Sequence, residues 1–193
     1  MNDWSFEKRL NTGLLLVAFV VFGMIIINCI NDPLKKTCTP RVGPLEVTPS
    51  VAVARNIVED WRYKGALAAA QLGTYLDFPF IVLYSITFWF FSVWAGIALG
   101  PYDKRWPDYG RAFGRAGIAA GALDFFVENT GLLLEMSGRY NRWITFIKAI
   151  GAWIKWVLVL LLIVFLLTSW FMWLRIWWDK KHGVSRPVLP EEL

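Results

Sequence analysis

The chain has 193 residues, of which 56% are hydrophobic and only 18% charged, with a mean hydropathy of +0.45. A soluble domain carries about a quarter charged residues, and the length leaves no room for a separate soluble catalytic domain beside the long apolar runs. The net charge of +5 fits contact with anionic lipid headgroups. The basic residues are scattered over every loop and do not form one stripe, which argues against a nucleic-acid partner.

The first predicted membrane span covers residues 12–29, just long enough for a hydrocarbon core of ~30 Å. Lys8 and Arg9 precede it, as in a signal peptide, but no small-x-small cleavage site follows, and we therefore expect an uncleaved span. Cys29 and Cys38 frame the loop that comes next. They either form a disulfide in an oxidising compartment or remain two thiols, because spacing alone does not decide between these states.

An amphipathic helix is predicted over residues 50–62, with Thr48 as its N-cap and Pro49 in its first turn. Apolar residues recur along one side at helical spacing: Val51, Ala54, Ile57, Val58 and Trp61. Such a helix is expected to lie along the membrane surface, with this side turned toward lipid or toward the bundle.

The second predicted span covers residues 76–99, after a short Ala-rich entry segment at 65–75, and Pro79 is expected to kink it. A polar turn at 100–111 leads into the third span, residues 112–136. The first half of that span is rich in glycine and alanine, which allow helices to approach closely in lipid.

The fourth predicted span covers residues 143–178 and carries tryptophans near both ends, as in aromatic belts. A polar tail, residues 179–193, follows and is expected to be extended. Lysine and arginine are divided equally between the two sides. The basic residues close to span ends at 104–115 and 175–186 favour both termini in the cytoplasm. The predicted fold class is an all-α membrane protein: one domain, a four-helix transmembrane bundle with an amphipathic surface helix between spans 1 and 2.

Polar side chains inside the predicted spans mark a candidate site, because charges in spans usually face the bundle interior and are paired or functional. Asp124 and Glu128 are four residues apart and project from one side of their helix. Counting helical rise from the connecting turns places the carboxylates and the lysine of neighbouring spans at similar heights. The predicted members of a ligand or proton site are Asp77, Tyr84, Asp124, Glu128, Asn129 and Lys155.

Two interpretations of these residues stay open. The first is a buried polar staple in which Asp77 or Glu128 pairs with Lys155 and holds the helices in register. The second is a polar pocket that binds or moves a proton, a cation or the head of an amphiphile, since neighbouring carboxylates favour sharing a proton. The only histidine, His182, lies in the tail, and we expect no metal site and no cofactor, while catalytic residues cannot be named.

Two sequence elements resemble an uncharacterised, mainly bacterial family of four-helix membrane proteins. One is an LDxxF…Y element, carried here by Leu76, Asp77, Phe80 and Tyr84, and the other joins Asp124, Glu128 and Asn129 on the next span. The similarity covers residues 45–136. It implies a bacterial inner-membrane location and the same site residues, and it implies no particular activity.

The function expected from the sequence is non-enzymatic: an accessory, binding or structural subunit of a membrane complex, with the lipid bilayer and other membrane subunits or further copies of the chain as partners. One alternative is a proton-coupled carrier or channel component, and another is a lipid-modifying enzyme that uses the carboxylates. A filled, ion-paired interior favours the structural role, whereas a water-lined path favours transport. A closed apolar pocket ending at Asp77 and Glu128 favours the binding of a ligand or a lipid.

Overall fold

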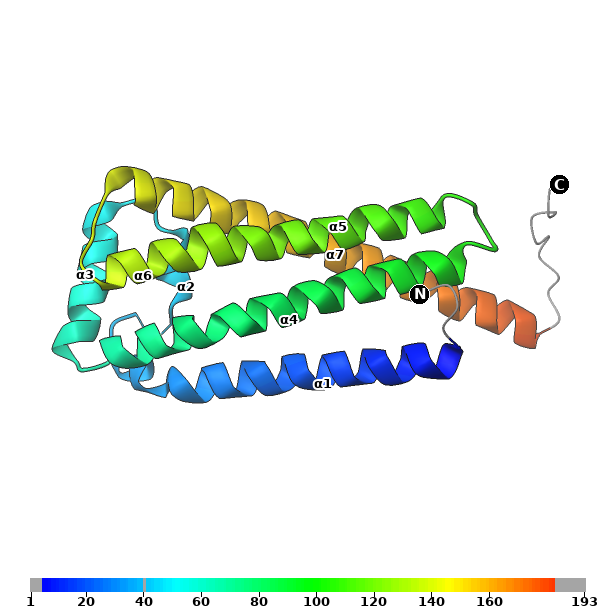
Figure 1. Cartoon of the computed structure of the whole chain (residues 1–193), viewed down its shortest axis with the longest axis horizontal. Helices are drawn as coiled ribbons and strands as arrows, with labels where there is room; N and C mark the ends of the chain where they lie inside the picture. Colours follow the sequence, from blue (N-terminus) through cyan, green and yellow to red (C-terminus); the bar gives the residue numbers. More distant parts are fainter. Residues whose placement is uncertain (1–4, 40, 183–193) are drawn as a thin grey trace.

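The computed structural model describes residues 5–39 and 41–182, and all regular secondary structure within these ranges is helical. The elements in chain order are α1 (Phe6–Ile30), η1 (Asp32–Lys36), α2 (Gly43–Val47), α3 (Val51–Tyr63), α4 (Leu67–Leu99), α5 (Trp106–Leu123), η2 (Asp124–Asn129), α6 (Thr130–Met136) and α7 (Arg142–Lys181) (Figure 1). Four helical rods are long and apolar enough to cross a membrane: α1, α4, the continuous rod α5–η2–α6, and α7. The predicted all-helical chain with four such helices is confirmed.

The helices extend beyond the predicted spans. α1 begins at Phe6, where the Ser5 hydroxyl accepts a hydrogen bond from the backbone N–H of Lys8. α4 takes in most of the predicted entry segment, and α7 continues to Lys181, so the first residues of the predicted tail are helical and not extended. The rest of that tail, residues 183–193, lies outside the described ranges. Hydropathy marks the part of a helix that suits lipid, whereas the backbone hydrogen bonds continue until a residue interrupts them.

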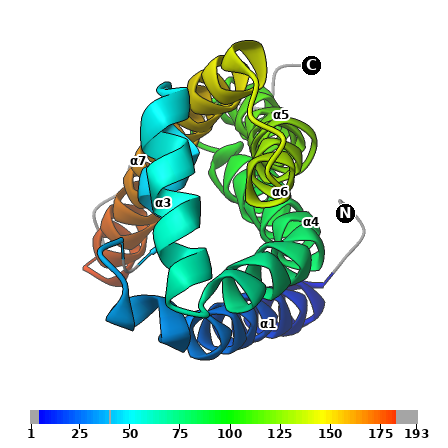
Figure 2. The ribbon, with the colours of Figure 1, turned by 90° about the vertical axis from the view of Figure 1, so that its left-hand side faces the viewer.

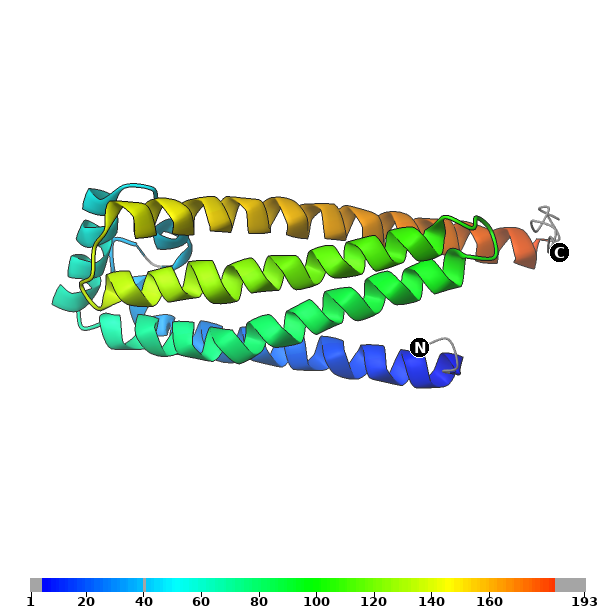
Figure 3. The same cartoon turned by 45° about the horizontal axis from the view of Figure 1, so that its top comes forward.

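The four rods run side by side, and α3 lies across one end of them (Figures 1 and 2). α4 bends along its length, and Pro79 lies inside it (Figure 3). The backbones of α4 and α5 approach closely at two glycines: a Cβ added to Gly110 would lie 2.6 Å from the Ser92 carbonyl oxygen and 2.9 Å from the Gly96 Cα. Gly110 lies in the predicted polar turn, outside the predicted span. Among the small residues predicted to allow close packing, Gly117 packs against α4, where an added Cβ would lie 2.9 Å from the Phe88 Cβ.

α1 packs antiparallel along α4, and close contacts at its glycines define the register. Gly13 lies against the ring of Phe91, and Gly23 lies against the ring of Phe80. Because both helices rise 1.5 Å per residue, Asp77 stands level with the last apolar turn of α1, and Tyr84 stands level with its middle. The two site residues on α4 therefore lie beside the lipid-compatible part of α1.

The N-cap of α3 is Ser50 and not Thr48. The Ser50 hydroxyl accepts a hydrogen bond from the backbone N–H of Val53, whereas the Thr48 hydroxyl accepts one from the backbone N–H of Ser50. Thr48 thus stabilises the turn before the helix, and Pro49 lies outside the first helical turn. Both residue types cap helices well, so the pattern alone could not choose between them.

The predicted amphipathic helix is confirmed, and its apolar side faces the bundle. Its buried residues pack with buried residues of η1, α2, α4 and α6 in one hydrophobic core: Leu34, Leu45, Ala54, Ile57, Val58, Trp61, Ala66, Ala70, Leu132 and Met136. Trp61 is fully buried, and its indole N–H donates to the Thr39 carbonyl at 2.9 Å. α3 therefore closes this end of the bundle.

Polar contacts, and not a disulfide, hold the loop between α1 and α3. Cys29 and Cys38 are both free and exposed. The backbone N–H of Cys38 donates to the Asp60 carboxylate at 2.9 Å, and the Lys64 ammonium lies 3.3 Å from the same carboxylate. The Cys38 N–H, helped by Lys64, lowers the pKa of Asp60 from its ordinary value. Of the two states left open for the cysteines, the structure shows the unbridged one.

Candidate functional site

The third rod contains a π-helical turn, η2, at the predicted site. Residues Asp124–Asn129 form this turn between α5 and α6, and the Thr130 hydroxyl donates to the Phe125 carbonyl at 3.2 Å. π-Helical turns within α-helices are rare and are frequent at functional sites. Here the turn directs Asp124 and Glu128 to the lysine of α7, while Asn129 reaches α4.

Lys155 of α7 joins the two carboxylates of η2. Its Nζ lies 2.6 Å from Glu128 Oε1 and 3.3 Å from Asp124 Oδ1, and it donates a hydrogen bond to each. All three side chains are at most 8% exposed. Three of the predicted site residues, from two different spans, thus form one buried ion-paired group.

α4 completes the cluster through hydrogen bonds. The Tyr84 hydroxyl donates to Asp124 Oδ2 at 2.7 Å. The Asn129 amide donates to Asp77 Oδ2 at 3.2 Å and to a backbone carbonyl of α4 at 3.4 Å. The structure therefore brings all six predicted residues together. Of the two pairings considered for Lys155, it forms the one with Glu128, whereas Asp77 is connected to the cluster through Asn129.

The acidic cluster, as we call Asp77, Asp124 and Glu128 with Lys155, holds three carboxylates and one ammonium group. Glu128 is 1% exposed, and its Oε2 is buried and accepts no hydrogen bond from any described residue. An uncompensated carboxylate in an apolar interior is costly. A proton shared among the carboxylates would remove part of this cost, so the cluster has the chemistry to hold one.

A second ion pair, absent from the sequence prediction, lies nearer the α3 end. Lys148 Nζ of α7 and Glu135 Oε2 of α6 are 2.6 Å apart, and both side chains are fully buried. The Thr145 hydroxyl donates to the other carboxylate oxygen at 2.6 Å, and Lys148 also donates to the Leu45 carbonyl of α2. This pair thus connects three helices.

The two ion pairs share one helical register. Glu128 and Glu135 are seven residues apart on the third rod, and Lys148 and Lys155 are seven residues apart on the antiparallel α7. Seven residues are close to two helical turns, so each set faces one direction. The equal spacing of two acidic and two basic residues was the available sequence signal. It was missed because Glu135 stands next to the polar turn between the spans and Lys148 lies within the first two helical turns after it.

Gly131 lies between the two glutamates and gives the Lys148 side chain its room. A Cβ added there would lie 3.0 Å from both Cβ and Cγ of Lys148.

No group of three or more His, Cys, Asp or Glu side chains within residues 5–39 and 41–182 is placed to hold a metal ion. In the acidic cluster, Lys155 contacts two of the three carboxylates.

Comparisons with known proteins add no further assignment: no family model, curated protein or solved structure matches the chain. The resemblance to a family of four-helix membrane proteins accordingly remains a prediction.

Proposed function

We propose that this chain is a non-enzymatic, multi-pass membrane protein that serves as a binding or structural subunit, and that its buried charges set the register of the third and fourth spans. The observation that carries the proposal is the pair of ion pairs, Glu128–Lys155 and Glu135–Lys148, with equal spacing on two antiparallel helices. The interior at the predicted site is ion-paired, which is the arrangement that favours a structural role over a transport path.

Register follows from the cost of breaking both pairs at once. Sliding α7 by one turn, ~5.4 Å, would move both lysines away from their carboxylates. Breaking a buried pair leaves an uncompensated charge, at about 3–5 kcal/mol for each pair. In lipid there is no hydrophobic driving force between helices, so their register depends on close packing and on polar contacts between them. The ion pairs therefore add register specificity between the third and fourth spans to that of close packing.

The structural role is tested at Lys155. Lys155→Met should destabilise the bundle, because it leaves Asp124 and Glu128 without their cation. Adding Glu128→Leu and Asp124→Asn to the same protein should restore most of the lost stability, measured by reversible unfolding in mixed micelles. A triple variant no more stable than Lys155→Met would contradict a structural ion pair.

A second function, proton coupling, is favoured by one specific observation: carboxylates outnumber the lysine, and Glu128 Oε2 has no partner among the described residues. The wild-type protein in liposomes loaded with a pH-sensitive dye would then pass protons under a potassium-diffusion potential, and Glu128→Gln would abolish the flux while the protein stays folded. Absence of wild-type flux above that of empty liposomes would reject this function.

We also propose that the protein resides in the bacterial inner membrane with both termini in the cytoplasm and α3 on the outer side. Basic residues close to the span ends at the opposite end of the bundle support this orientation. Cys29 and Cys38 are exposed near α3, so an impermeant maleimide should label them in intact spheroplasts. The thiol introduced by Lys104→Cys, in a Cys29→Ser and Cys38→Ser background, should react only after permeabilisation. The reverse pattern would invert the topology.

A further inference from the structure

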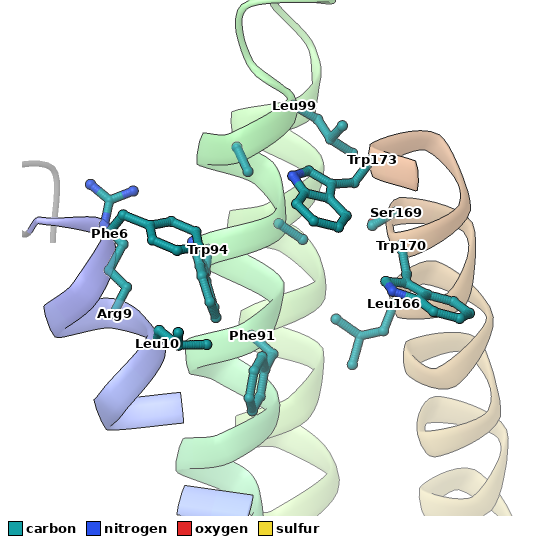
Figure 4. Close-up of a pocket in the computed structure, with 12 residues that line it drawn as sticks. Phe6, Arg9, Leu10, Phe91, Trp94, Leu99, Leu166, Ser169, Trp170 and Trp173 are labelled. Atoms are coloured by element: carbon teal, nitrogen blue, oxygen red, sulfur yellow. The ribbon is translucent and has the colours of Figure 1, made fainter. Parts of the chain in front are cut away.

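A cavity of about 540 Å³ opens between α1, α4 and α7, at the end of the bundle opposite α3. α1 lines it with Phe6 and Arg9, α4 with Trp94, and α7 with Trp170 and Trp173 (Figure 4). We call this cavity the lateral groove. It lies outside the acidic cluster and shares no residue with it.

The lining of the lateral groove is almost entirely apolar. Aromatic and aliphatic side chains form most of it, and the one hydroxyl, that of Ser169, donates to the Phe165 carbonyl of its own helix at 2.7 Å. The volume falls within the range of about 300–1,000 Å³ usual for ligand sites. A transmembrane helix, ~10 Å across, would occupy roughly 400 Å³ for each turn, so a second span would extend well beyond the groove. A single alkyl chain is much thinner and fits.

The groove lies where a bilayer passes from hydrocarbon to headgroups, given the proposed membrane location. The uninterrupted apolar run of α1 begins at Leu14. Arg9 stands five residues before that point, or ~7 Å along the helix, and tryptophans gather at such depths. Leu10 and Phe91 line the deeper part. Figure 4 shows the Arg9 side chain extending along α1 toward the end of the bundle, beside Phe6.

This end of the bundle is rich in positive charge. Besides Arg9, the basic residues at this end of α1, on the α4–α5 connection and on α7 include Lys8, Lys104, Arg105, Arg175 and Lys181, and they outnumber the acidic Glu7, Asp103 and Asp179. A guanidinium binds phosphate oxygens in a bidentate manner, and an indole N–H can donate to ester or phosphate oxygens. An occupant with an apolar chain and an anionic head complements both the lining and the charge.

We infer that the lateral groove binds one acyl chain of an anionic glycerophospholipid, with the phosphate of that lipid on Arg9. The inference rests on the proposed membrane location but not on the structural role of the acidic cluster. The lipid would fill the space between α1 and α7 and connect the two helices at this end.

The test uses the full chain in lipid nanodiscs with two probes, phosphatidylglycerol and phosphatidylcholine that carry the same photoreactive acyl chain. Mass spectrometry maps the labelled peptides. Phosphatidylglycerol should label the groove-lining parts of α1, α4 and α7 several-fold more than phosphatidylcholine does. Arg9→Gln should bring phosphatidylglycerol labelling down to the phosphatidylcholine level. Ala98→Phe, which fills the groove, should reduce labelling by both probes at these peptides.

Arg105→Gln is the matched control, because it removes the same charge from an exposed position at the same end outside the groove. It should keep the preference for phosphatidylglycerol. Equal labelling by both probes, or an equal loss in Arg105→Gln and Arg9→Gln, would overturn the proposal, as would photo-crosslinks from the groove to a second copy of the chain. Gel filtration and circular dichroism establish that each variant is folded. The labelling measures where the lipid binds and does not depend on the ion pairs. A negative labelling result would therefore leave the structural role of Lys155 intact, and a negative Lys155 result would leave the lipid site intact.

Discussion

The buried pair of Lys148 and Glu135 permits the sharpest test of the energetics. Lys148→Met keeps the unbranched stem that packs on Gly131 and removes the ammonium group. Glu135 then retains the Thr145 hydroxyl as partner but no cation, and the Leu45 carbonyl loses a donor. Because both charged side chains are fully buried, the expected cost is about 3–5 kcal/mol.

This cost is a large part of a typical folding free energy of about 5–15 kcal/mol. Lys148→Met should therefore unfold at a much lower SDS fraction than the wild type in mixed micelles, followed by tryptophan fluorescence and circular dichroism. Glu135→Leu alone should cost a similar amount, since it leaves the ammonium uncompensated. The double variant should regain most of the loss, giving a favourable coupling energy between the two positions. In it, the Thr145 hydroxyl can bond within its own helix, as Thr168 does with the Val164 carbonyl.

Asp108 and Arg111 provide the matched control. They form an ion pair with a short separation of 2.5 Å, but their side chains are 73% and 59% exposed. Asp108→Asn should therefore cost less than about 1 kcal/mol. The reasoning is refuted if Lys148→Met falls within 1 kcal/mol of the wild type, or if the double variant is no more stable than either single one.

Three further predictions concern the packing and the α3 end. Gly110→Ala should destabilise the bundle by forcing α4 and α5 apart, because its Cβ would meet the α4 backbone at 2.6 Å, whereas Gly43→Ala, with nothing within 4 Å, should leave the unfolding midpoint unchanged. Trp61→Phe should cost at least about 0.5–1.5 kcal/mol in the unfolding free energy, because it removes the indole hydrogen bond to Thr39 and part of a fully buried ring; an unchanged midpoint would contradict this role of Trp61. Hydrogen bonding lowers the pKa of Asp60 in the folded state, so the stabilisation is present above its ordinary value of 3.8 and is lost as the pH falls below it. Asp60→Asn should reduce this acid sensitivity in unfolding measured at pH 3 and pH 6, and an equal pH response in both proteins would contradict the assignment.

The sequence by itself determined the four long helices and the amphipathic helix, because their signals are local. A span needs about 20 consecutive apolar residues, and α3 shows the helical repeat that ends in Ile57, Val58 and Trp61. The cost of charge in lipid singled out Asp77, Asp124, Glu128 and Lys155. Their positions along the helices were enough to predict one cluster.

The details of that cluster required the tertiary structure. The π-helical turn leaves no mark in hydropathy, and it directs Glu128 to Lys155 while Asn129 reaches Asp77. Glu135 lies beside a polar turn, where the sequence gives no sign that its charge is buried. It becomes buried only when α2 and α7 pack against α6. Its burial depends on contacts between elements distant in the sequence, which no local pattern records.

The lateral groove depends on tertiary structure for a similar reason. α1 is apolar on all sides, so its sequence contains no stripe that selects a packing face. The structure places it along α4, with Gly13 against Phe91 and Gly23 against Phe80. The space beside α7 follows from that choice. Hydropathy determined that α1 can cross a membrane, and the fit of two glycines against two aromatic rings decided where it packs and which cavity it leaves open.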